Sequence, residues 1–177
     1  MTISSLQYSS GSIGTSYKTP NLTDATSSAS RKIASGPALR TFMAIADVWS
    51  LTEEQRLRIL GYPPRSTYQH WAKFARNHTD IVLDFDTLIR ISLIFGIYRA
   101  LGTLFSTEKE GAAWLRGPHK ATVFSGKPPI ELMTTGMQDD LYTTRRYLDA
   151  ATMGYFGSPN EADRDFKPYT DSEISFS

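Results

Sequence analysis

The chain of 177 residues is 40% hydrophobic and 12% aromatic, which is enough to bury a core but favours one compact unit or two small ones over several domains. Its formal net charge of +1 excludes a histone-like protein, although a local basic patch could still bind nucleic acid. The absence of cysteine excludes disulfides, thiolate nucleophiles and most zinc sites, and it fits a reducing cytoplasm. The N-terminus lacks the basic and apolar regions of a secretory signal.

The composition of the chain and the spacing of its apolar residues change at Pro37. Residues 1–37 are rich in Ser, Thr and Gly without a helical or alternating period, which predicts a flexible N-terminal tail ending at Gly36 and Pro37. From Ala38 to Trp49 the apolar residues recur at spacings of three and four. This spacing predicts a helix with one apolar stripe.

Two short helices are expected next. The first is introduced by Thr52 with Gln55, or by Ser50 with Glu53, and it stops at Gly61. After a rigid Tyr-Pro-Pro turn, Ser66 with Gln69 predicts a capping box for a helix that continues to Arg76. Two short helices joined by a tight turn are typical of a helix-turn-helix motif.

The second helix of this motif has a polar side. A helical wheel places Thr67, Trp71 and Phe74 on the packing side. The DNA-binding candidates on the other side are Arg65, Gln69, Lys73 and Arg76. Gln69 could bond adenine bidentately and Arg65 could read guanine or hold a phosphate, whereas Lys73 and Arg76 fit phosphate contacts. The alternative is a solvated polar face in a helical bundle.

The most apolar stretch lies between Leu88 and Phe105. Arg90 and Arg99 leave its uninterrupted apolar run shorter than the ~20 residues that span a bilayer. It therefore predicts a central buried helix, in which a change such as Leu93 to Ala is costly, and it completes a helical region over residues 38–105. Acidic residues just before the stretch, Asp84 among them, could cap this helix.

The next region, residues 106–157, combines short helices with a stiff loop. Thr107 with Glu110 predicts a capping box, and the helix stops at Gly117 and Pro118. A loop with two Gly/Pro punctuations follows, and then one or two helices to Leu148; such a shaped loop suits recognition better than catalysis. Residues 158–177 read as a flexible acidic tail with aromatic residues, a composition that favours docking on another protein.

Catalytic and metal-binding patterns are absent from the sequence. The three histidines have no acidic partner at a ligand-like spacing, so no metal site is expected. Asp139 and Asp140 could serve a small hydrolase, but adjacent helical residues point about 100° apart, and capping or solvation explains them better. No nucleophile has a recognisable base. We therefore expect a binding protein without catalytic residues or cofactors.

Two sequence blocks resemble the Xre/MbcA/ParS antitoxin family. They are Leu60–Trp71 and the pair Ala113–Pro118 and Gly126–Leu132, and the resemblance covers about residues 40–150 without the tails. It implies an all-α antitoxin of a bacterial type II toxin-antitoxin system, with a helix-turn-helix bundle followed by a small helical toxin-binding region. The implied partner is a RES-domain toxin, an ADP-ribosyltransferase-like enzyme that consumes NAD and whose NAD site the antitoxin blocks. The implied location is the cytoplasm.

The resemblance assigns roles to particular positions. The apolar positions Trp114, Leu115, Ile130 and Leu132 match those of the family and are expected in the core. The toxin-binding candidates are Arg116, Lys127, Arg145 and Arg146, because cations could approach an acidic cleft; each could instead be a solvated surface charge. Family members often carry Asn-Pro-rich residues where this chain has His119, Lys120 and Ala121, so details of that loop are not transferred.

The helix-turn-helix motif supports a different function as well. The alternative is a free-standing DNA-binding transcriptional repressor that uses the polar side of the second helix of the motif. Both functions can coexist, since antitoxins often repress their own operon. We expect a homodimer or a toxin-antitoxin hetero-oligomer, operator DNA as a possible further partner, and no membrane association.

Overall fold

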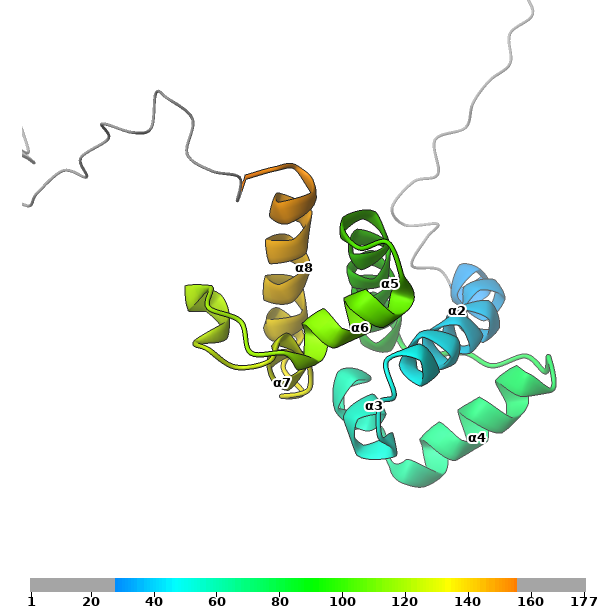
Figure 1. Ribbon diagram of the computed structural model, residues 1–177. Helices are drawn as coiled ribbons and strands as arrows, with labels where there is room; N and C mark the ends of the chain where they lie inside the picture. The colour runs from blue at the N-terminus through cyan, green and yellow to red at the C-terminus, as the bar shows by residue number, and fades with distance from the viewer. Residues whose placement is uncertain (1–27, 156–177) are drawn as a thin grey trace, which may run out of the picture.

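The computed structural model describes residues 28–155, and these residues form seven α-helices and one short 3-10 helix without any strand (Figure 1). The predicted all-α class is confirmed. The expected tail over residues 158–177, and most of the expected N-terminal tail, lie outside the described residues.

The first helix, α2 (Ser28–Val48), begins ten residues before the position expected from the sequence, so the predicted tail boundary at Pro37 is wrong. Pro37 lies inside the helix on its exposed side. Ser35 is fully buried, donates a hydrogen bond to the Arg31 carbonyl (2.6 Å) and accepts one from the Leu83 backbone N–H (2.9 Å). The hydrogen bond from Leu83 and the burial of Leu39 and Phe42 are tertiary contacts that stabilise α2 despite Pro37, whereas local sequence rules treat the cost of a proline in a helix, about 3 kcal/mol, as decisive.

The helix-turn-helix unit is completed by α3 (Glu53–Ile59), α4 (Arg65–Arg76) and the first half of α5 (Phe85–Leu104). The capping box of Thr52 with Gln55 is confirmed, and Asp84 caps α5. The predicted capping box of Ser66 is wrong: α4 begins at Arg65, and Pro64 occupies the capping position without a side-chain hydrogen bond. Because the helix begins at Arg65, Ser66 already lies within its first turn and cannot cap it.

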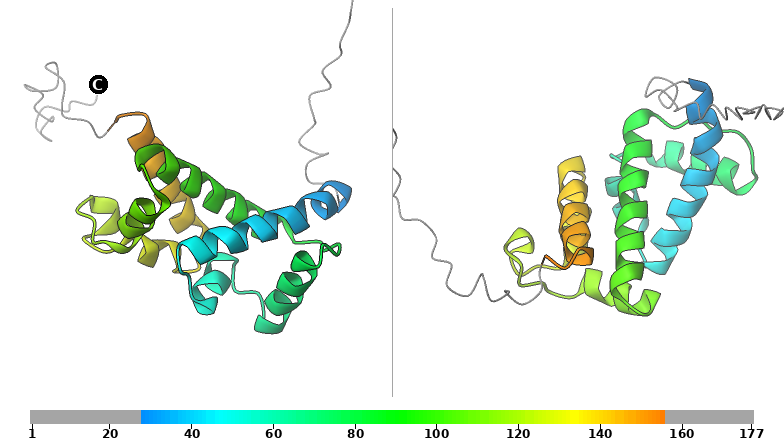
Figure 2. Two further views of the ribbon diagram at one scale, coloured as in Figure 1. Left: turned by 45° about the vertical axis from the view of Figure 1, so that its right-hand side comes forward. Right: turned by 90° about the horizontal axis from the view of Figure 1, so that it is seen from above.

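The C-terminal unit consists of α6 (Glu108–Arg116), the 3-10 helix η1 (Thr122–Phe124), α7 (Pro129–Met133) and α8 (Gln138–Thr152). The capping box of Thr107 with Glu110 is confirmed. Helix α5 packs between α2 and α8, an arrangement that Figure 2 shows from above. Within the described chain α5 is long and apolar enough to cross a membrane, but half of that window is buried against other helices, as in a core helix.

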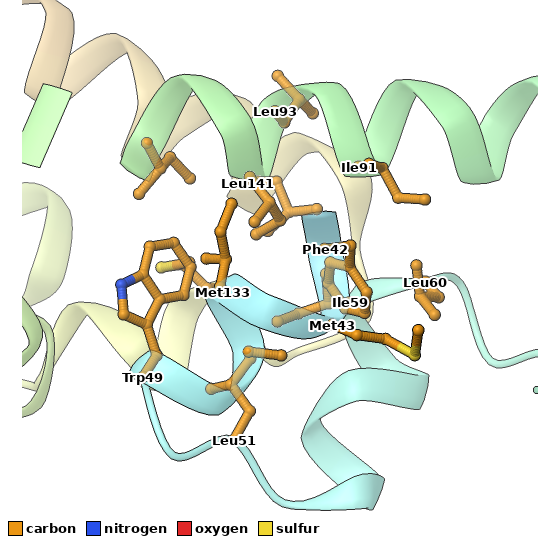
Figure 3. Close-up of a cluster of buried hydrophobic side chains, with 14 of the residues drawn as sticks. Phe42, Met43, Trp49, Leu51, Ile59, Leu60, Ile91, Leu93, Met133 and Leu141 are labelled. Carbon is orange, nitrogen blue, oxygen red and sulfur yellow. The ribbon is translucent and has the colours of Figure 1, made fainter. Parts of the chain in front are cut away.

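One apolar core joins the two units. Figure 3 shows Phe42 and Met43 of α2 on the side of α5 that carries Ile91, with Met133 and Leu141 of the C-terminal unit on the same side and Leu93 on the other side of α5. Leu115 and Ile130 are buried in this core as expected, whereas Trp114 and Leu132 are only partly buried. Because α5 belongs to both units and the core is continuous, neither unit is expected to fold independently of the other.

Candidate functional site

All four predicted DNA-binding residues of α4 are exposed, and within the described part of the chain three of them are free of ion pairs with other helices. Gln69, Lys73 and Arg76 are exposed, whereas Tyr68 and Ala72 are buried along the opposite line. The residues expected to pack, Thr67, Trp71 and Phe74, are only partly buried, because the buried line is centred one residue further along the helix.

The fourth residue, Arg65, is engaged by its neighbour. Its Nε forms an ion pair with Oε1 of Glu53, across the turn that joins α3 to α4. A guanidinium that reads guanine must break or share this pair, so the first turn of α4 offers less free positive charge than the sequence predicts. Wheel analysis of α4 alone misses this contact, because Glu53 comes from α3.

A buried arginine connects the two units. The Arg90 side chain of α5 donates from Nε to Oδ2 of Asp86 (2.6 Å) and from Nη1 to the Gly136 carbonyl (2.9 Å). The Tyr62 ring lies so close to Gly136 that a Cβ there would come within 2.3 Å of it. The turn of the helix-turn-helix motif therefore contacts the segment that leads into α8.

Arg116, a predicted toxin contact, also connects the two units, because it reaches from α6 to the end of α2. Its Nη2 donates to the carbonyls of Trp49 (2.5 Å) and Ser50 (2.8 Å), just beyond the end of α2. It thus supplies a hydrogen-bond donor to two backbone carbonyls of the turn that follows α2. The proposed binding residue has a structural role in this conformation.

The neighbouring residues Arg145 and Arg146 differ in their surroundings. The Nε of Arg145 lies 2.8 Å from both carboxylate oxygens of Asp149, and its guanidinium occupies the space in which a Cβ on Gly96 would lie. Arg146 is 71% exposed, with Nη2 3.5 Å from Asp139 Oδ1. Only Arg146 of the two remains available to a partner without disturbing the packing of α5 on α8.

A small aromatic cluster supports the loop between α6 and α7. It consists of Trp114, His119, Phe124 and Tyr147, with ring centres 5.0–6.2 Å apart. The backbone N–H of Ala121 donates to His119 Nδ1 (3.2 Å), which assigns the proton of a neutral ring to Nε2, 3.4 Å from the Tyr147 hydroxyl. Burial raises the pKa of the Tyr147 phenol above its ordinary value of 10.0, so the hydroxyl keeps its proton at neutral pH.

The packing of His119 against Tyr147 in this cluster was not predicted from the sequence. No local spacing connects it to Tyr147, which lies on α8; the aromatic residues at 114 and 124 were the available signal. The remaining carboxylates considered above are also engaged: Asp140 accepts a hydrogen bond from the Thr135 hydroxyl. Among residues 28–155, no group of three or more metal-ligating side chains comes together.

The loop between α6 and α7, which this cluster supports, is closed by two backbone hydrogen bonds. The His119 N–H donates to the Lys127 carbonyl (3.2 Å), and the Gly126 N–H donates back to the His119 carbonyl (3.1 Å). Between the loop and α7 lies a groove of about 290 Å³, lined in part by Val123, Pro128 and Leu132. Lys127 and Glu131 are both exposed and also line the groove.

Comparison with known proteins finds two matching family models. Residues 28–95 match the antitoxin Xre-like helix-turn-helix domain, and residues 100–154 match the antitoxin Xre/MbcA/ParS C-terminal toxin-binding domain. The first match begins where α2 begins, and the boundary between the two falls within α5. The "Uncharacterized protein y4oB" of Sinorhizobium fredii (strain NBRC 101917 / NGR234) is 37% identical over 129 residues, which are 72% of this chain and 95% of that protein.

Proposed function

The chain belongs to the Xre/MbcA/ParS antitoxin family, and from this premise we propose that it is the antitoxin of a bacterial type II toxin-antitoxin pair in the cytoplasm. Its partner is a RES-domain toxin, an NAD-consuming enzyme whose NAD site the antitoxin blocks. The observation that supports this proposal is the order of the two matched domains, a helix-turn-helix unit followed directly by a toxin-binding unit. In this assignment the catalytic residues and the cofactor belong to the toxin.

The contact residues of this function lie in the C-terminal unit. We assign direct toxin contact to Lys127 and Arg146, which are exposed. Arg116 connects this unit to the end of α2 through the Trp49 carbonyl, and Arg145 pairs with Asp149 within α8, so we assign both a positioning role in toxin binding.

Co-expression tests this function directly. Expressed with a RES-domain toxin encoded in the adjacent reading frame, the chain should restore growth, keep the cellular NAD level close to that of toxin-free cells, and co-purify with the toxin. A variant with Arg146→Ala and Lys127→Ala should fold normally and restore growth less well. Unrescued growth together with no isolable complex would reject the proposal.

A second function, repression of its own operon, is supported by the exposed face of α4. Gln69, Lys73 and Arg76 form a polar and basic surface on the second helix of the motif, the helix that enters the major groove in such proteins. The same surface would serve the alternative, a free-standing repressor without a toxin partner.

Binding to promoter DNA separates these two possibilities from a toxin-only function. Gln69→Ala should relax base preference, whereas Lys73→Ala should weaken binding to all sequences and reduce the salt slope by about one. Fluorescence anisotropy with a labelled fragment of its own promoter measures both effects, and Lys109→Ala on α6 provides an exposed control. Light scattering with and without toxin then distinguishes a homodimer from a hetero-oligomer.

A further inference from the structure

The loop between α6 and α7 is already fixed in one conformation. Its two ends are joined by the reciprocal backbone hydrogen bonds of His119. Phe124, which is 3% exposed, belongs to the aromatic cluster and attaches η1 to it. A surface loop that is fixed in this way loses little conformational entropy when a partner binds it. The loop is therefore suited to serve as a rigid recognition element.

The charge on this segment is one-sided. Residues 111–130 contain the cations Arg116, Lys120 and Lys127 and no Asp or Glu. Arg116 is engaged with the carbonyls near the end of α2, which leaves Lys120 and Lys127 exposed on the loop itself. A positive loop of this kind attracts an acidic surface and steers its approach.

The groove beside the loop provides an apolar contact. Val123, which is 36% exposed, and Leu132 contribute apolar surface to the 290 Å³ groove. This space is comparable to one or two large side chains, and it lies inside the segment that matches the toxin-binding family model. An apolar pocket with a charged rim is the arrangement in which interface anchor residues are found.

We propose that the closed loop of residues 117–128 and its groove form the docking surface for an acidic segment of the toxin, with one apolar toxin side chain in the groove and carboxylates against Lys120 and Lys127. This inference rests on the proposed function and specifies where the toxin is held. Glu131 also lines the groove, and its charge has the wrong sign for an acidic segment. Reversing the charge of Glu131 should therefore have the opposite effect to reversing the charge of Lys127.

The experiment measures binding kinetics of the full-length chain to its purified RES-domain toxin. The double variant Lys120→Glu and Lys127→Glu should bind at least tenfold more weakly, mainly through slower association, and the difference should shrink at high salt. Val123→Asp should raise the dissociation rate at least tenfold, and Glu131→Lys should leave the affinity unchanged or raise it. The matched control is Arg99→Glu with Lys109→Glu, which makes the same change in net charge at exposed positions of α5 and α6.

Each outcome decides the inference. If the wild-type chain binds and the loop variants, with unchanged circular dichroism, bind as tightly as the control, the inference is overturned while the antitoxin function stands. It is equally overturned if Glu131→Lys weakens binding as much as the double lysine variant does. It is also overturned if the loop variants change the oligomeric mass of the free chain and leave toxin binding unchanged, because the loop would then be a contact between copies. If the wild-type chain binds no RES toxin, the proposed function fails, and this inference fails with it.

Discussion

Helices α4 and α8 both carry cations that the sequence assigns to binding partners, yet only α4 keeps most of them exposed. Helix α4 packs mainly on α2, so one face is buried and Lys73 and Arg76 remain in solvent. Helix α8 packs on both α5 and α7, and Gly96 of α5 leaves space into which Arg145 fits. The difference teaches that a pattern on one helix predicts its exposed face when the helix has one neighbour, and fails when the helix packs between two neighbours and one of them has a glycine that leaves space for a charged side chain.

The largest expected effect tests whether the two units are as separable as their family matches suggest. Leu141 is fully buried in the core that α8 shares with α5, so Leu141→Ala should lower the free energy of unfolding by about 3 kcal/mol, within the usual 2–5 kcal/mol for such changes. Because α5 belongs to both units, the loss should appear equally in α4. Hydrogen exchange of α4 and α8 peptides at increasing urea measures this; unchanged protection of α4 would show that the units unfold separately.

The next effect concerns the connection between the units. Arg90→Ala removes the hydrogen bonds to Asp86 and to the Gly136 carbonyl at a side chain that is only 11% exposed. Since these are charge-assisted bonds at a largely buried position, we expect a loss of about 2 kcal/mol in urea unfolding. Arg58→Ala, at a more exposed ion pair with Glu54, is the control and should change stability by less than about 0.5 kcal/mol. Equal losses in the two variants would contradict a special role for Arg90.

A smaller effect separates the two neighbouring arginines of α8. Arg145→Ala should destabilise the protein by about 1 kcal/mol, since it breaks the pair with Asp149 and leaves space over Gly96. Arg146→Ala should stay within about 0.5 kcal/mol of the wild type, because its side chain is exposed, but it should weaken toxin binding. Thermal unfolding and toxin affinity measured on both variants test this pair. A stable Arg145 variant with lost affinity would return Arg145 to the contact surface.

The sequence predicts the helices of this fold better than their boundaries and its exposed charges better than its buried ones. Capping boxes at Thr52 and Thr107 are local patterns, and both are found. The start of α2 depends instead on Ser35 bonding to Leu83, 48 residues away, and the place of Arg145 depends on Gly96. Such contacts form between segments distant in the chain, so no periodicity or capping rule within one segment can predict them.

The smallest expected effect concerns the aromatic cluster that packs α8 against the loop between α6 and α7. Because burial raises the pKa of Tyr147 above 10.0, the folded chain binds more protons than the unfolded chain once the pH exceeds about 10, so this tyrosine makes stability fall as the pH rises through that range. Below that pH its contribution is constant. Tyr147→Phe keeps the ring in the cluster and removes only the hydroxyl that titrates, so this variant tests the pH dependence.

The measurement is the urea midpoint of both proteins from neutral to alkaline pH, together with tyrosinate absorbance. Replacing Tyr147 by Phe should make the alkaline loss of stability shallower, while Tyr155→Phe, at an exposed position just beyond α8, should leave it unchanged. An identical alkaline slope in all three proteins would mean that the Tyr147 phenol titrates as it does in the unfolded chain. The cluster would then support the loop through ring packing alone, and the rigidity of the docking surface would be independent of pH.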